Sequence, residues 1–318
     1  MNLDLLKNQQ NLIDFLTNAY KKGRLAHAYI FEGDEGVGKN ELAHYFAALL
    51  YSDSKVDLNS NVSRQIFADE HLNVFTIYPD GKNIKKDQIK DLQEEFSKTS
   101  QVNGDRVYII NDADKMNVTS QNSLLKFIEE PPKGVYGILL TTNASALLPT
   151  ILSRCQLFKL ADLSTELVYK LLVKEGIDKK VALLISLLTN DLENGKELAN
   201  NTYMLKVIDM FNKFFNLKRD REIVKYFNDL SKLNLDINLF NYYIKLLIIA
   251  YLDMLYLLKG NVSIKLVSYA DKLSKFIERI DEQKALKSLD YLYSVSNMLN
   301  NTNVSIKNII TGLMFNLL

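Results

Sequence analysis

The chain has 318 residues, 47% of them hydrophobic, and its 39 basic side chains almost balance 38 acidic ones. This balance argues against a general nucleic-acid coat or an acidic-tail protein, and the single cysteine, Cys155, excludes an internal disulfide and a cysteine-rich zinc site. The length allows about two or three domains, each with a core of its own.

The N-terminal half alternates short apolar runs with helical patterns. Five runs are typical of strands, the first of them a short buried one: residues 28–31, 73–77, 106–110, 136–142 and 156–160. Apolar residues at helical spacing follow each of the first three runs. Strands separated by single helices cannot be joined as hairpins, so the pattern predicts a mainly parallel sheet with helices on both faces. Residues 1–160 are therefore predicted to form an α/β domain.

The C-terminal half shows helical stripes in place of strands. One apolar stripe runs from Leu239 to Leu258, a second runs from Leu266 to Ile280, and no proline follows Pro149. Each stripe is either the core of a helical domain or a surface that packs on another subunit. We predict a small helical lid at residues 161–205 and an all-α domain at 206–318.

Membrane association and export are not expected from the sequence. The first four residues lack a basic segment followed by an apolar core, and so do not resemble a secretory signal. The most apolar run, residues 246–258, is shorter than a bilayer-spanning helix and contains Asp253. The sequence therefore predicts a soluble, cytoplasmic protein without a membrane partner.

A glycine-rich loop follows the first predicted strand. Gly33, Gly36, Gly38, Lys39 and Asn40 belong to an eight-residue segment with the spacing G-x-x-x-x-G-K. In a phosphate-binding loop the backbone N–H groups, the helix N-terminus and the lysine bind phosphate, and a Ser or Thr after the lysine binds Mg²⁺. Asn40 offers only an amide there. A glycine-rich turn before a helix is also a common structural feature, so both interpretations stay open on the motif alone.

The end of the third predicted strand carries the second half of such a site. In an active P-loop ATPase an Asp-Glu pair follows this strand, the first acid for Mg²⁺ and the second to polarise the attacking water. This chain has Asn111 and Asp112 instead. Both residues could also simply cap the next helix. Because positions 40 and 111 are both asparagine, our hypothesis is a degenerate site that keeps Lys39, lacks a metal ligand and has lost hydrolysis.

Longer motifs resemble one known family. Residues 112–116 (DADKM), 121–132 (QNSLLKFIEEPP), 139–143 (LLTTN) and 148–156 (LPTILSRCQ) are similar to the bacterial clamp-loader AAA+ family, and most of all to its delta prime branch within DNA polymerase III. The resemblance covers residues 24–160. A short match at residues 303–306 resembles the last helix of the family.

The resemblance implies a P-loop AAA+ domain, a lid and a C-terminal collar in a five-part loader. Such a loader opens a ring-shaped sliding clamp and places it on primed DNA, as part of a polymerase holoenzyme that is a nucleotidyltransferase. The implied partners are the gamma/tau and delta subunits, the clamp indirectly, and primed DNA within the complex. Part of the stripe from Leu239 to Leu258 is then expected to contact another subunit.

The resemblance also assigns roles at the ATP sites. Arg154, in Ser-Arg-Cys, would enter the ATP site of the adjacent subunit as a trans arginine finger. Delta prime members are usually non-hydrolysing, so we expect no ATPase activity of the chain itself, no required cofactor, and weak or absent ATP binding. The alternative is a hydrolysing motor subunit of the gamma/tau kind, or another AAA+ ATPase. Asn40 and Asn111 argue against that alternative, because a motor needs both metal contacts.

One departure from the family concerns zinc. Members commonly carry four cysteines between the first helix and the second strand of this domain. Residues 53–73 of this chain contain none. We therefore expect no zinc, and a metal-free loop in place of a zinc ribbon.

Overall fold

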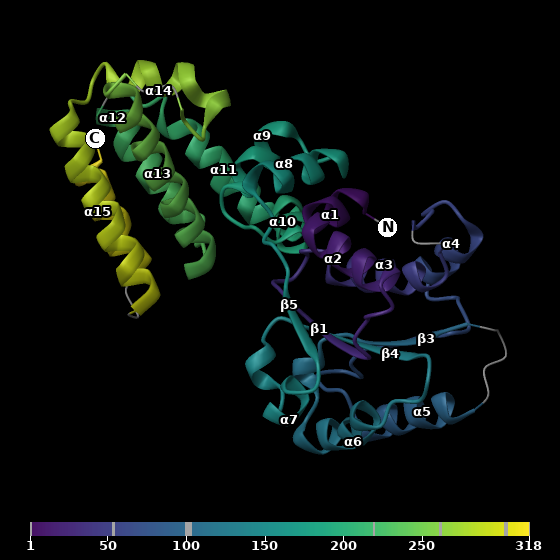
Figure 1. Cartoon of the computed structure of the whole chain (residues 1–318). Helices are drawn as coiled ribbons and strands as arrows, with labels where there is room; N and C mark the ends of the chain where they lie inside the picture. Colours follow the sequence, from purple (N-terminus) through teal and green to yellow (C-terminus); the bar gives the residue numbers. More distant parts are fainter. Residues whose placement is uncertain are drawn as a thin grey trace. The chain divides into compact units, whose positions relative to one another are not determined.

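The computed structural model describes residues 2–52, 55–98, 104–218, 220–260, 263–301 and 305–317 (Figure 1). Asn303 and Val304, in the match to the last helix of the family, lie outside these residues. The chain forms two compact units, Met1–Leu163 and Ser164–Leu318. The boundary between the units falls close to the predicted end of the α/β domain at residue 160.

The first unit is built on a parallel five-stranded sheet, as predicted. Its strands, in the spatial order β2-β3-β4-β1-β5, are β1 (Ala28–Glu32), β2 (Val74–Ile77), β3 (Arg106–Ile110), β4 (Val135–Thr141) and β5 (Gln156–Lys159). All five residues of β3 are buried, and so are the first four of β1. Because both strands are covered on two faces, their sequences are continuous apolar runs without an alternating pattern.

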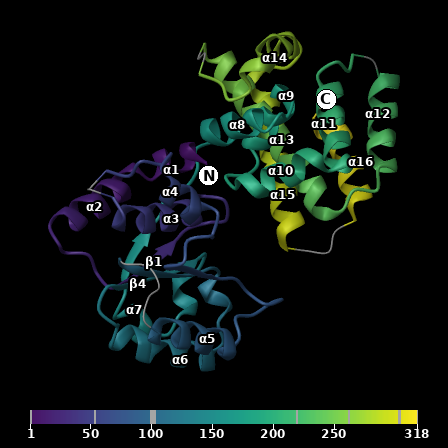
Figure 2. The same ribbon diagram turned by 90° about the vertical axis from the view of Figure 1, so that its right-hand side faces the viewer.

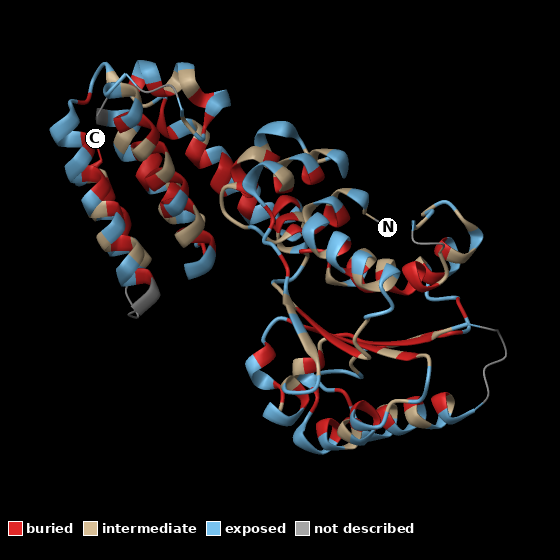
Figure 3. Cartoon of the chain, in the orientation of Figure 1, coloured by how far each residue is buried: buried red, intermediate tan, exposed pale blue. Residues whose placement is uncertain are grey.

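Helices cover both faces of this sheet. They are α1 (Leu3–Asn8), α2 (Gln10–Lys21), α3 (Lys39–Leu50), α4 (Asn61–Phe67), α5 (Lys86–Ser97), α6 (Val118–Glu129) and α7 (Pro149–Leu152), with 3₁₀ turns at Ala113–Lys115 and Ala144–Ala146. Helices α1 to α4 lie on one face and α5 to α7 on the other (Figures 1 and 2). Figure 3 shows the strands as a buried layer between helices that are exposed on their outer sides.

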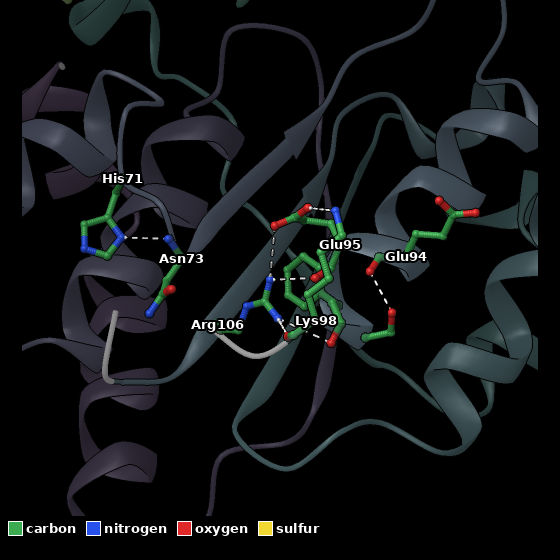
Figure 4. Close-up of polar contacts among 8 residues, drawn as sticks. His71, Asn73, Glu94, Glu95, Lys98 and Arg106 are labelled. Carbon is green, nitrogen blue, oxygen red and sulfur yellow. Dashed lines mark hydrogen bonds and ion pairs between the residues drawn. The ribbon is translucent and has the colours of Figure 1, made fainter. Parts of the chain in front are cut away.

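The amino end of β3 is joined to α5 by a buried arginine. The guanidinium of Arg106 donates to three carbonyls at the end of α5, those of Glu95 (3.1 Å), Phe96 (3.3 Å) and Lys98 (3.1 Å) (Figure 4). It also lies 4.2 Å from the centre of the Phe96 ring. A helix leaves its last carbonyls without partners, so Arg106 completes the hydrogen bonding of this end of α5.

The secondary-structure elements described in the second unit are all helices, as predicted. It contains α8 (Thr165–Lys174), α9 (Lys179–Ser186), α10 (Leu192–Asn200), α11 (Thr202–Phe214), α12 (Asp220–Lys232), α13 (Ile237–Leu258), a 3₁₀ turn (Val267–Tyr269), α14 (Ala270–Ile277), α15 (Glu282–Asn301) and α16 (Ile306–Asn316). Helices α8, α9 and α10 pack together, and α13 packs on α11, α14 and α15. Helix α11 runs through the predicted lid boundary at residue 205, so a separate lid stays a prediction.

The most apolar segment, residues 246–258, lies within α13, a helix that extends over 22 residues and, by length and composition alone, could cross a membrane. Just over half of its apolar window, 56%, is nevertheless buried in the protein. Asp253 is 1% exposed and accepts hydrogen bonds from the backbone of Lys265 (3.1 Å) and Leu266 (2.7 Å).

The stripe along α13 packs mostly within its own unit. Leu239, Tyr243, Leu246, Leu247, Ala250 and Met254 are buried. Of the remaining stripe residues, Leu257 is half-buried and Leu258 is 37% exposed. The core interpretation therefore accounts for most of the stripe, and any contact of α13 with another subunit is confined to its C-terminal turn or to residues outside the stripe.

Candidate functional site

The glycine-rich loop connects the end of β1 to the start of α3. Strand β1 ends at Glu32 and α3 begins at Lys39. Gly36 (φ 74°) and Gly38 (φ 98°) adopt left-handed backbone conformations, which favour glycine. A Cβ atom at Gly38 would also lie 3.1 Å from the Cβ of Leu5 in α1. The loop therefore has the strand-to-helix placement that a phosphate loop requires, and its glycines are needed for its shape.

Lys39 is held against the carbonyls of its own loop. Its ammonium group donates to the carbonyls of Gly33 (2.6 Å) and Asp34 (2.7 Å). Burial lowers the pKa of Lys39 from its ordinary value, while nearby acidic groups, Asp112 first among them, act in the opposite direction. Strands β1 and β3 both pair in parallel with β4, so the end of β3, with Asn111 and Asp112, lies at the same edge of the sheet as the loop.

The two positions that would contact the metal have different surroundings. Asn40 is exposed, and its backbone carbonyl accepts a 2.7 Å hydrogen bond from Nδ1 of His44. Asn111 is only 6% exposed, and its Nδ2 is buried with no hydrogen-bond partner among the described residues. Neither position carries a carboxylate or a hydroxyl, so the residues present do not fit the Mg²⁺ ion of a P-loop ATPase.

Asp112 does not act as a helix cap. It has a left-handed backbone (φ 47°) and precedes a 3₁₀ turn without forming a side-chain cap hydrogen bond. Its carboxylate is paired with the ammonium group of Lys115 (2.8 Å). The following helix, α6, is capped by Asn117, whose side chain accepts from the backbone N–H of Ser120 (2.9 Å). Capping therefore does not explain the polar pair at positions 111 and 112.

Two further polar residues lie beside this site and were not singled out from the sequence. Thr141, fully buried at the end of β4, donates to Asp114 (2.6 Å). Gln9, 2% exposed, donates to the carbonyls of Val37 (3.2 Å) and Ala161 (2.8 Å) and accepts from the N–H of Ala161 (2.9 Å). Gln9 thus ties the N-terminal helices to the loop and to the end of β5. No periodic pattern marks a single glutamine, and only the fold shows its role.

Arg154 lies at the opposite edge of the sheet. It lies two residues before the start of the short β5, whereas the loop follows β1, and in a parallel sheet the amino and carboxyl ends of strands form opposite edges. The strands have four to seven residues, so roughly 13 Å or more separates the edges. The side chain is 39% exposed. Arg154 is therefore not part of the chain's own loop site.

Three contacts hold the guanidinium of Arg154. Nη2 lies 2.9 Å from a carboxylate oxygen of Glu129, at the end of α6. Nη1 donates to the carbonyl of Thr150 (3.0 Å) and to the hydroxyl of Ser153 (3.2 Å). The motif at residues 121–132 and the motif at residues 148–156 are therefore in contact through Glu129 and Arg154. The neighbouring Cys155 is half-buried, and burial raises the pKa of its thiol to about 12.

A polar network joins α3 to β2 and to the segment that precedes β2. His44 of α3 has two acceptors, the carbonyl of Asn40 and, at 2.9 Å, the carboxylate of Asp69. Asp69 also accepts from the hydroxyls of Thr76 (2.7 Å) and Tyr78 (2.9 Å). Across the parts of the chain that the structure describes, no three His, Cys, Asp or Glu side chains are grouped to hold a metal. The absence of zinc from this chain stays a prediction.

Comparison with known protein sequences gives matches to subunits of DNA polymerase III. The family model described as DNA polymerase III, delta subunit, matches residues 8–164. The chain is 37% identical over 201 residues to subunit delta prime of DNA polymerase III from Bacillus subtilis, covering 61% of this chain and 60% of the relative. It is 31% identical over 162 residues to subunit tau from Escherichia coli, covering 50% of this chain and 25% of the relative.

These matches are partial in length. They span 60% or less of the relatives' own sequences. Among solved structures, a gamma subunit-related protein of DNA polymerase III from Thermotoga maritima covers 91% of this chain and 93% of its own, at 17% identity and a TM-score of 0.42. A likeness this distant adds nothing to the assignment.

Proposed function

The chain belongs, through residues 8–164, to the bacterial clamp-loader AAA+ family of DNA polymerase III, and we propose that it is a delta prime-like subunit without ATPase activity of its own. The observation that carries the proposal is the loss of both metal contacts, at Asn40 and Asn111, from an otherwise intact loop. The proposed partners are gamma/tau and delta subunits, the sliding clamp and primed DNA, in a cytoplasmic holoenzyme. Residues 206–318 would provide the contribution of this chain to the collar of the loader.

The electrostatics of the loop explain why hydrolysis would be lost. A transferring phosphoryl group needs a cation that bridges the phosphates, and that cation needs anionic or hydroxyl ligands from the protein. Asn40 is neutral and exposed, Asn111 is neutral and buried, and Asp112 is paired with Lys115. Lys39 and the loop amides can still attract phosphate, so any nucleotide they bind would be held without productive Mg²⁺.

The contribution to catalysis would come from Arg154 and act on a neighbouring subunit. Arg154 is exposed, lies at the sheet edge opposite its own loop, and is held by Glu129 and Thr150. An arginine in this position suits insertion into a site on another chain, where it would neutralise charge on the transferring phosphoryl group. Where such trans arginines act, they contribute about 10³–10⁵ to the rate.

The second candidate is a hydrolysing motor subunit or another AAA+ ATPase. The similarity to a tau subunit and the retained Lys39 favour this alternative. It requires that Mg²⁺ be held without the residues normally used at positions 40 and 111. The two candidates differ in what happens when Lys39 is removed.

We predict that Lys39→Ala leaves the reconstituted loader active. Steady-state ATPase activity and clamp loading on primed DNA should stay within about twofold of wild type, because no ATP is cleaved at this loop. The matched control is the same substitution at the P-loop lysine of the gamma/tau subunit, which should abolish most hydrolysis. A large loss of ATPase activity from Lys39→Ala, with normal assembly by gel filtration, would establish the motor alternative.

A further inference from the structure

Glu129 occupies a position that helix energetics alone do not favour. It is the last residue of α6, and Glu130 follows it at the helix end. The C-terminus of a helix carries partial negative charge and prefers lysine or arginine to a carboxylate. Local helix stability therefore does not explain two acids at this end, and a long-range partner is needed to account for Glu129.

Arg154 supplies that partner and in turn receives a defined orientation. An arginine side chain has many rotamers and loses that freedom when it binds. Thr150 and Ser153 engage Nη1, and Glu129 engages Nη2 from a different helix. A guanidinium has five N–H donors, so two donors remain after these contacts, and the side chain is 39% exposed. The group is thus oriented while keeping donors for a ligand.

We propose that Glu129 is a positioning residue for Arg154. Glu129 holds the guanidinium of Arg154 in the orientation in which the arginine enters the ATP site of the adjacent subunit. This inference rests on the proposed trans function of Arg154. Both side chains of the ion pair are exposed, 39% for Arg154 and 45% for Glu129, so the pair contributes little to the stability of the fold. Removing the carboxylate of Glu129 should therefore change the orientation of the arginine side chain and leave the fold intact.

The test compares Glu129→Gln with Glu130→Gln in the reconstituted loader, on clamp and primed DNA. Glu130 is the matched control, since it is the exposed acid next in sequence and has no role in the contacts of Arg154. Glu129→Gln should slow single-turnover hydrolysis at the adjacent site on the order of 10-fold to 10²-fold, with an unchanged KM for ATP. Glu130→Gln should hydrolyse ATP at the wild-type rate.

A double-mutant cycle with Arg154→Ala separates this inference from the function on which it rests. Glu129→Gln should have no further effect once Arg154 is alanine, because it acts only through the arginine. If Arg154→Ala leaves hydrolysis unchanged, the trans function itself fails. If Arg154→Ala slows hydrolysis but Glu129→Gln does not, or if Glu129→Gln has the same effect in both backgrounds, the positioning role alone is overturned.

Discussion

Replacing Arg154 by alanine is expected to stop fast ATP hydrolysis at one site of the reconstituted loader. The adjacent site should lose on the order of 10³-fold in rate, because the transferring phosphoryl group loses a positive charge that no water molecule replaces. Since one copy of this chain serves one neighbouring site, the fast phase of a single-turnover experiment should lose one ATP per complex. Assembly should be unaffected, because Arg154 is exposed and its partner Glu129 becomes solvated.

Quenched-flow measurement of phosphate formation, with the subunits mixed in defined ratios, gives the amplitude of this fast phase directly. Arg154→Lys keeps the charge but not the planar fork of donors, and so should fall between alanine and wild type. The matched control is Arg64→Ala, another exposed arginine in the same unit, on α4. A full fast phase in the Arg154→Ala complex would exclude the trans function.

Replacing Arg106 by methionine is expected to destabilise the first unit by about 2–3 kcal/mol. Three carbonyls at the end of α5 lose a charged donor, and each such hydrogen bond contributes about 1.5–3 kcal/mol. Relief from burying the guanidinium, whose Nε has no hydrogen-bond partner among the described residues, offsets part of that loss. Methionine fills a similar volume, so the change measures hydrogen bonding and charge more than packing.

Native-state hydrogen exchange of the amides in α5 and β3 measures this loss within the first unit. Protection in both elements should fall together, because Arg106 joins them (Figure 4). Lys98→Met changes an exposed side chain at the same helix end and should leave protection unchanged. Unchanged protection in Arg106→Met would show that the three hydrogen bonds contribute no net stability.

Much of the fold could be predicted because its signals are local. Strands β1 to β4 are short and largely apolar runs, and the loop from Gly33 to Lys39 has a fixed spacing between a strand and a helix. Both features depend on residues close in sequence, which periodicity and spacing describe. The parallel sheet then followed from the alternation of strands with helices.

The contacts that define the site could not be predicted in the same way. Glu129 and Arg154 are 25 positions apart, and Gln9 reaches across 152 positions to Ala161. No periodic pattern encodes such pairs, because they depend on how separate elements pack.

The absence of hydrolysis at the chain's own loop is the central claim, and an ATPase assay of the isolated chain tests it most directly. With saturating ATP and Mg²⁺, phosphate release should not exceed that of buffer alone, because Asn40 and Asn111 leave the metal without ligands. The double variant Asn40→Thr, Asn111→Asp restores both metal contacts, and its nucleotide binding can be compared with that of the wild-type chain. Turnover by the wild-type chain near 1 s⁻¹, within the ordinary range of enzymes, would contradict the claim.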